Sequence, residues 1–140
     1  MTRERVIWLA VAVLAACGID AAGVPAAPAK RSVALAIRFD NGPRKVSRGT
    51  LTCRSGEERA TGIARPAARS CAGIRKLAPR LISQPPKDRV CSMIYGGPQK
   101  VRVTGTIDGK HVDRIFTRTN GCQIADYDRL AAALPAIAVK

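Results

Sequence analysis

The chain has 140 residues, of which 24 are lysine or arginine and 10 are aspartate or glutamate, so its formal net charge is +14. This length holds one small domain together with export and linker segments, and it leaves no room for a second large domain. Aromatic residues make up 4% of the sequence, so the core must come mainly from Val, Ile, Leu and Ala. Small domains with such thin cores often need disulfide bonds.

The first 16 residues are predicted to be a signal peptide. Residues 2–5, Thr-Arg-Glu-Arg, are a short positive segment, and residues 6–16 are an unbroken apolar run. Such a run is too short to span a bilayer comfortably, but it has the length and the flanks of a signal-peptide core. The chain is therefore expected to be exported.

The apolar run ends in Leu14-Ala15-Ala16-Cys17-Gly18, which resembles a bacterial lipobox, where a peptidase cuts before a cysteine that carries lipid. Lipid on Cys17 would anchor the protein to a membrane, and it would explain why the number of cysteines, 5, is odd. The alternative is a simple secretory signal cleaved within residues 21–29, which leaves Cys17 incidental. The expected location is extracellular, or at the cell surface as a lipoprotein.

Residues 17–31 are rich in Ala, Gly and Pro and have no periodic apolar face, so they are predicted to form a lipidated, flexible tether. The folded domain is expected over residues 32–135, and residues 136–140 are expected to be a short tail. The sequence contains no internal repeat.

Two strands are predicted at the start of the domain. Residues 32–39 alternate between apolar and polar, which places four apolar side chains on one buried face: Val33, Leu35, Ile37 and Phe39. Asn41-Gly42-Pro43 ends this strand. A second, shorter strand is predicted over residues 50–53, with Leu51 and Cys53 pointing inward.

A helix is predicted after Pro66, because proline is favoured in the first turn of a helix. Apolar residues follow at helical spacing: Cys71, Ile74, Leu77 or Ala78, and Leu81. Gly73 weakens this pattern, and Pro79 is expected to limit the length of the helix. Residues 82–86, Ile-Ser-Gln-Pro-Pro, then predict an extended, turn-rich segment.

A β-hairpin is predicted next. Val101, Val103 and Ile107 alternate with polar residues, and Asp108-Gly109 is a strong signal for a two-residue turn. Residues 112–116 then form the returning strand.

The last predicted element is a short helix over residues 126–134, which Pro135 ends. It places on one face Tyr127, Leu130, Ala131 and Leu134. Asp126 and Asp128 are expected to favour the start of this helix rather than to bind a metal. The order of the elements predicts an α+β domain with an antiparallel sheet.

Four cysteines remain when Cys17 is set aside, and in an exported chain they are expected to be oxidised: Cys53, Cys71, Cys91 and Cys122. Four cysteines allow three pairings, and the spacing alone does not choose between them. Each bridge is expected to stabilise the fold by about 3 kcal/mol, because it restricts the unfolded chain.

Several segments, in order and in spacing, resemble the Streptomyces subtilisin inhibitor family over residues 32–124. They are Gly49-Thr50-Leu51-Thr52-Cys53, Ser70-Cys71-Ala72, Val90-Cys91-Ser92-Met93-Ile94-Tyr95, and Val103-Thr104-Gly105 through Gly109-Lys110 to Phe116 and Cys122. The resemblance implies a five-stranded antiparallel sheet with two helices, the disulfides Cys53–Cys71 and Cys91–Cys122, and in many members a homodimer. It also implies that Met93-Ile94 is the reactive bond of a loop that binds a serine protease.

The chemistry of this segment suits such a role. A protease takes its substrate as an extended strand and seats one side chain in a specificity pocket. Met93 suits a broad apolar pocket, and Val90 suits an apolar subsite three residues upstream. Tyr95 offers a large flat contact on the leaving side, downstream of the reactive bond. A bridged Cys91 would fix the loop two residues before Met93, with Ser92 between them, which lowers the entropy lost on binding.

The sequence departs from the family pattern in places. Ser92 stands where proline is usual, and Gly96-Gly97-Pro98 is one residue longer than the family's Asp-Pro. The chain is also more basic than typical members, and its end is predicted to be helical rather than a final aromatic-rich strand. The loop changes bear on affinity more than on the fold.

Other interpretations are weaker. Taken alone, Met93 and Ile94 with Val90 favour a buried strand. The flanking Cys91, prolines and glycines argue for an exposed, ordered loop, and the resemblance to the inhibitor family decides for the loop. His111 is the only histidine, and the core cysteines form no close Cys-x-x-Cys pair, so a metal site, a cofactor or a Ser-His-Asp enzyme has no support.

Two functions therefore compete. The first is an exported inhibitor of subtilisin-like or chymotrypsin-like serine proteases, whose partner is an extracellular protease. The second is a basic envelope lipoprotein that keeps the fold as a binding or structural module. Nucleic acid is not an expected partner, because the basic residues are scattered rather than interleaved with aromatics.

Overall fold

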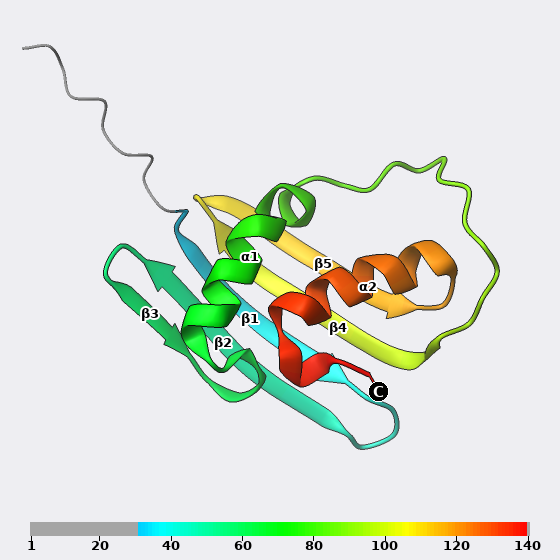
Figure 1. Ribbon diagram of the computed structural model, residues 1–140, viewed down its shortest axis with the longest axis horizontal. Helices are drawn as coiled ribbons and strands as arrows, with labels where there is room; N and C mark the ends of the chain where they lie inside the picture. Colours follow the sequence, from blue (N-terminus) through cyan, green and yellow to red (C-terminus); the bar gives the residue numbers. More distant parts are fainter. Residues whose placement is uncertain (1–30, 140) are drawn as a thin grey trace, which may run out of the picture.

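The computed structural model describes residues 31–139, which form a five-stranded antiparallel sheet with both helices on one face (Figure 1). The strands are β1 (Val33–Asp40), β2 (Val46–Arg54), β3 (Glu57–Ala60), β4 (Gly97–Ile107) and β5 (Lys110–Arg118). The helices are α1 (Ala67–Ile82) and α2 (Gly121–Ala133), with short 3-10 helices η1 (Gly62–Ala64) and η2 (Pro135–Ile137). The predicted α+β class is confirmed.

The central strand is β1, which pairs with β2 on one side and β4 on the other in the order β3-β2-β1-β4-β5. Its alternating pattern buries one face of the strand, because the four apolar residues predicted from the sequence all point into the core between the sheet and the helices. The opposite face of the sheet has no helix over it (Figure 1).

The hairpin between β4 and β5 turns at Asp108-Gly109, as predicted. Both residues have positive φ angles, 51° and 74°, which the favoured two-residue turn requires and which Asp and Gly tolerate. The Asp108 carboxylate also accepts a hydrogen bond from the backbone N–H of Ser32 at 2.8 Å, so the turn is tied to the start of the domain.

The short strand β3 was not predicted, because Glu57-Glu58-Arg59-Ala60 has no apolar alternation. It is the edge strand beside β2, which itself is longer than the predicted segment 50–53. This hairpin completes the five strands, although the described residues after Arg118, up to residue 139, form no strand.

Helix α1 begins after Pro66, as predicted, but it continues through Pro79 to Ile82. The helical pattern, which was predicted to reach Leu81, therefore ends within one residue of the prediction, with Pro79 inside the last turn. Ser83 hydrogen-bonds the Pro79 carbonyl through its backbone N–H and its hydroxyl. Gly73 is required by packing, because a Cβ there would lie 2.5 Å from the Cβ of Ala133 on α2.

Helix α2 begins at Gly121, so the predicted start at Asp126 is wrong. Asn120 provides the N-cap, with its side-chain oxygen accepting a hydrogen bond from the Gln123 N–H at 3.0 Å. Beyond the helix, Ile137 is buried, and its carbonyl accepts a 2.7 Å hydrogen bond from the hydroxyl of Tyr127. The packed region thus extends past residue 135, the predicted end of the domain.

The two disulfides are Cys53–Cys71 and Cys91–Cys122, the pairing that the resemblance implies. The first joins β2 to α1, and both of its cysteines are fully buried. The second joins the α1–β4 loop to the first turn of α2 and lies nearer the surface. Within residues 31–139, no helix is long and apolar enough to cross a membrane.

Candidate functional site

The loop between α1 and β4, residues 83–96, passes outside the N-terminal end of α2 (Figure 1). It contains no helix or strand, and it carries four exposed large apolar side chains: Val90 (100% exposed), Met93 (91%), Ile94 (62%) and Tyr95 (66%). The alternative that this segment is a buried strand is therefore wrong. Contiguous exposed apolar residues on a soluble domain usually mark a binding surface.

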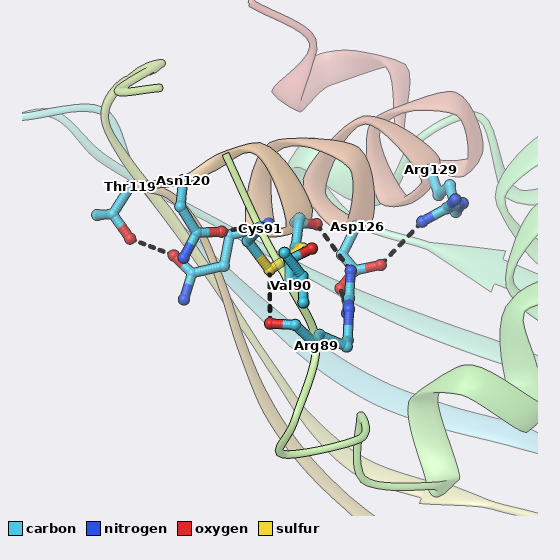
Figure 2. The surroundings of a disulfide bond; sticks show 9 residues. Arg89, Val90, Cys91, Thr119, Asn120, Asp126 and Arg129 are labelled. Carbon is cyan, nitrogen blue, oxygen red and sulfur yellow. Dashed lines mark hydrogen bonds and ion pairs between the residues drawn. A yellow bond between two sulfur atoms is a disulfide. The ribbon is translucent and has the colours of Figure 1, made fainter. Parts of the chain in front are cut away.

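The entry to this exposed segment is held by Arg89. Its guanidinium lies 2.6 Å from the Asp126 carboxylate of α2 (Figure 2). The same guanidinium donates a hydrogen bond to the Cys122 carbonyl at 3.3 Å. The Asp126 carboxylate also pairs with Arg129, at 2.9 Å. The Arg89 and Asp126 side chains are 30% and 22% exposed, so this contact is partly shielded from solvent. Asp126 therefore orients the loop rather than starting the helix.

Two residues further along, the loop is fixed to the beginning of α2. The Cys91–Cys122 bridge is followed by a hydrogen bond of 2.9 Å from the Gly121 N–H to the Ser92 carbonyl. Gly121 allows this close approach, because a Cβ there would lie 2.1 Å from the Ser92 hydroxyl oxygen.

The exit from the segment is held by Arg118 of β5. The Gly96 N–H donates to the Arg118 carbonyl at 2.7 Å, and the Arg118 Nε donates back to the Gly96 carbonyl at 3.0 Å. The guanidinium also pairs with Asp128 at 2.8 Å and lies 5.1 Å from the centre of the Tyr127 ring. Arg118 is only 15% exposed, so its position is well defined by packing.

Met93, Ile94 and Tyr95 thus lie between two anchored residues, Ser92 and Gly96. Within residues 31–139, no hydrogen bond joins the backbone of these three residues to another part of the chain. Their N–H and C=O groups therefore have no partner within residues 31–139 and are available to pair with a strand of another protein.

All six residues predicted for the loop, from Val90 to Tyr95, lie in this one segment, whereas Arg89, Arg118, Gly121 and Asp126 were not assigned to the site from the sequence. Nothing in the spacing indicates them, because Arg118 acts on a residue 22 positions away in the chain. In the described part of the chain, no three His, Cys, Asp or Glu residues are grouped so that they could hold a metal.

Comparison with protein-family models gives no match, and comparison with curated proteins gives none either. Among solved structures, the chain is similar to Streptomyces caespitosus sermetstatin, in the crystal structure of that protein in complex with Bacillus licheniformis subtilisin. The TM-score is 0.41 and the sequence identity 20%, over 79% of this chain and 99% of that chain. A likeness at this level does not assign the chain to a family.

Proposed function

We propose that the protein is an exported inhibitor of subtilisin-like serine proteases, which binds the enzyme in the manner of a substrate with Met93-Ile94 as the reactive bond. The observation that carries this proposal is an exposed apolar segment whose backbone is unpaired while both of its ends are anchored to β5 and α2. An ordered segment of this kind loses little conformational entropy on binding.

The side chains suit the subsites of such an enzyme. Met93 is unbranched, apolar and 91% exposed, so it can enter a deep apolar pocket without unfolding any of the core. Val90 would occupy an apolar subsite on the upstream side, and Tyr95 would pack on the leaving side. Chymotrypsin-like enzymes, which also have a hydrophobic primary pocket, are expected to be secondary targets.

The anchors also account for inhibition rather than simple cleavage. If the protease cuts between Met93 and Ile94, Cys91 keeps the upstream end on α2 and Arg118 keeps the downstream end on β5. The new termini therefore remain adjacent, and religation competes with release of the product.

Titration of subtilisin with the oxidised protein tests this function. We expect activity to fall linearly to zero at one inhibitor per enzyme. Met93→Asp should abolish inhibition, because it would bury an unpaired charge in an apolar pocket, whereas Met93→Leu should retain it. A protease that stays active in excess protein, or equal inhibition by Met93→Asp, would contradict the proposal.

We further propose that Cys17, which lies outside the described residues, carries lipid and places the inhibitor at the cell surface. The sequence Leu14-Ala15-Ala16-Cys17 supports this anchor. The competing function, a non-inhibitory envelope module, would leave the exposed and anchored Met93–Tyr95 segment without a role.

A further inference from the structure

A row of arginines crosses the face of the sheet that no helix covers. Arg38 on β1 lies directly opposite Arg48 on β2 and directly opposite Arg102 on β4. All three are exposed and belong to the polar side of their strands. Like charges directly opposite one another destabilise a sheet, so the fold itself gives no reason for this row.

Within residues 31–139, only one of the three arginines, Arg102, has its charge balanced by a carboxylate. Arg102 uses its Nε and Nη2 to bind both oxygens of Asp113, at 2.9 and 2.7 Å, which leaves its Nη1 without that partner. This hydrogen bonding lowers the pKa of Asp113. Arg38 and Arg48 form no ion pair with any residue in 31–139, and the nearby Asp40 accepts a hydrogen bond from the Gly42 N–H instead.

The three arginines border a shallow hollow of about 410 Å³, together with Thr50, Thr61 and Thr104. The hydroxyls of Thr50 and Thr61 lie 2.8 Å apart and share one hydrogen bond, so one of their two protons remains free to donate. The hollow thus offers guanidinium groups and at least one hydroxyl donor, with no carboxylate among its lining residues.

We propose that this hollow is a binding site for the phosphate group of a soluble molecule. A phosphate presents three or more acceptor oxygens and up to two negative charges, which matches guanidinium groups arriving from three adjacent strands. A carboxylate has only two oxygens and is satisfied by a single arginine, as Asp113 is by Arg102.

Other occupants fit this face less well. A membrane surface fits less well, because interfacial binding gains from buried apolar area as well as from charge, and the lining of the hollow is mainly arginine and threonine. A second copy of the chain stacked on this face would add three more arginines to the row, which like-charge repulsion opposes. A soluble phosphate removes the repulsion instead.

Calorimetric titration of the oxidised protein with inorganic phosphate and pyrophosphate, at constant ionic strength set with chloride, tests the proposal. We expect binding at one site, with acetate at the same concentration producing none. Arg38→Gln should weaken binding at least about tenfold, the effect of removing one charge-assisted contact. Asp113→Asn should tighten it, because Arg102 is then free to turn to the ligand.

The matched control is Arg54→Gln, which removes the same charge from an exposed residue of β2 that does not line the hollow. Arg54→Gln should leave phosphate binding unchanged. Arg38→Gln should inhibit subtilisin as the parent does, which would show that this variant is still folded. At the same phosphate concentration, the thermal midpoint of the parent should rise more than that of Arg38→Gln.

Four results would overturn the site. The first is no measurable binding of inorganic phosphate or of pyrophosphate, and the second is a loss of phosphate affinity in Arg54→Gln equal to that in Arg38→Gln. The third is binding only to vesicles of phosphatidylglycerol, and the fourth is dimerisation on addition of phosphate.

Discussion

Met93 is the side chain on which the choice of protease should depend, because it is almost fully exposed and contacts nothing that the fold needs. We predict that Met93→Lys shifts inhibition from subtilisin toward trypsin, since a cationic side chain pairs with the acid at the base of the trypsin pocket. Parallel titrations of both enzymes measure this. The thermal midpoint should not change, and an unchanged preference would place the reactive bond elsewhere.

Arg118 is the second residue whose effect can be separated from general stability. We predict that Arg118→Met weakens inhibition about tenfold or more, because Gly96 loses a side-chain hydrogen bond and the leaving side of the loop becomes mobile. Prolonged incubation with subtilisin should then accumulate chains cut at Met93-Ile94, with the two fragments still joined by Cys91–Cys122, whereas the parent should remain mostly uncut.

Asp128→Asn is the control for this change. It removes the ion pair with Arg118 but leaves the contact between Arg118 and Gly96, and Asp128 is 59% exposed. We expect inhibition close to that of the parent. Equal losses in the two variants would mean that Arg118 acts through the ion pair and not by positioning the loop.

At the scale of elements, what the sequence could predict follows from periodicity. Strand β1 and the Asp108-Gly109 hairpin have strong local patterns, and both were predicted correctly. Strand β3 has no such pattern, because as an edge strand it buries little and is held by its pairing with β2. The start of α2 depends on the Asn120 cap, which lies seven residues before Tyr127, the first residue of the apolar face that the helix pattern indicates.

The anchors of the loop could not be predicted for a related reason. Arg89 and Arg118 are two of 24 cationic residues, and only tertiary structure shows which of them hydrogen-bond backbone carbonyls. The exposed residues of the segment were predictable from the resemblance, together with the cysteine before Met93 and the glycines after Tyr95, which mark its ends.

The two disulfides should differ in what they support. We predict that replacing Cys91 and Cys122 with alanine leaves a folded domain but converts the inhibitor into a substrate, because this bridge holds the exposed loop to α2. Replacing the fully buried Cys53 and Cys71 should instead cost about 2–5 kcal/mol of the free energy of unfolding. Denaturant unfolding and subtilisin titration of both double variants separate the two effects, and loss of fold in the first pair would contradict this division.

At the scale of the whole molecule, the proposed anchor determines where the inhibitor meets its protease. We predict that the mature chain begins at Cys17 and that mass spectrometry finds lipid on its sulfur, with the protein recovered in the membrane fraction. Cys17→Ala should move the protein into the medium without changing inhibition of subtilisin, because the loop between α1 and β4 is anchored entirely by residues of the folded domain. An unmodified N-terminus downstream of Cys17 would show instead that the protein is freely secreted, in which case it would act away from the cell that makes it.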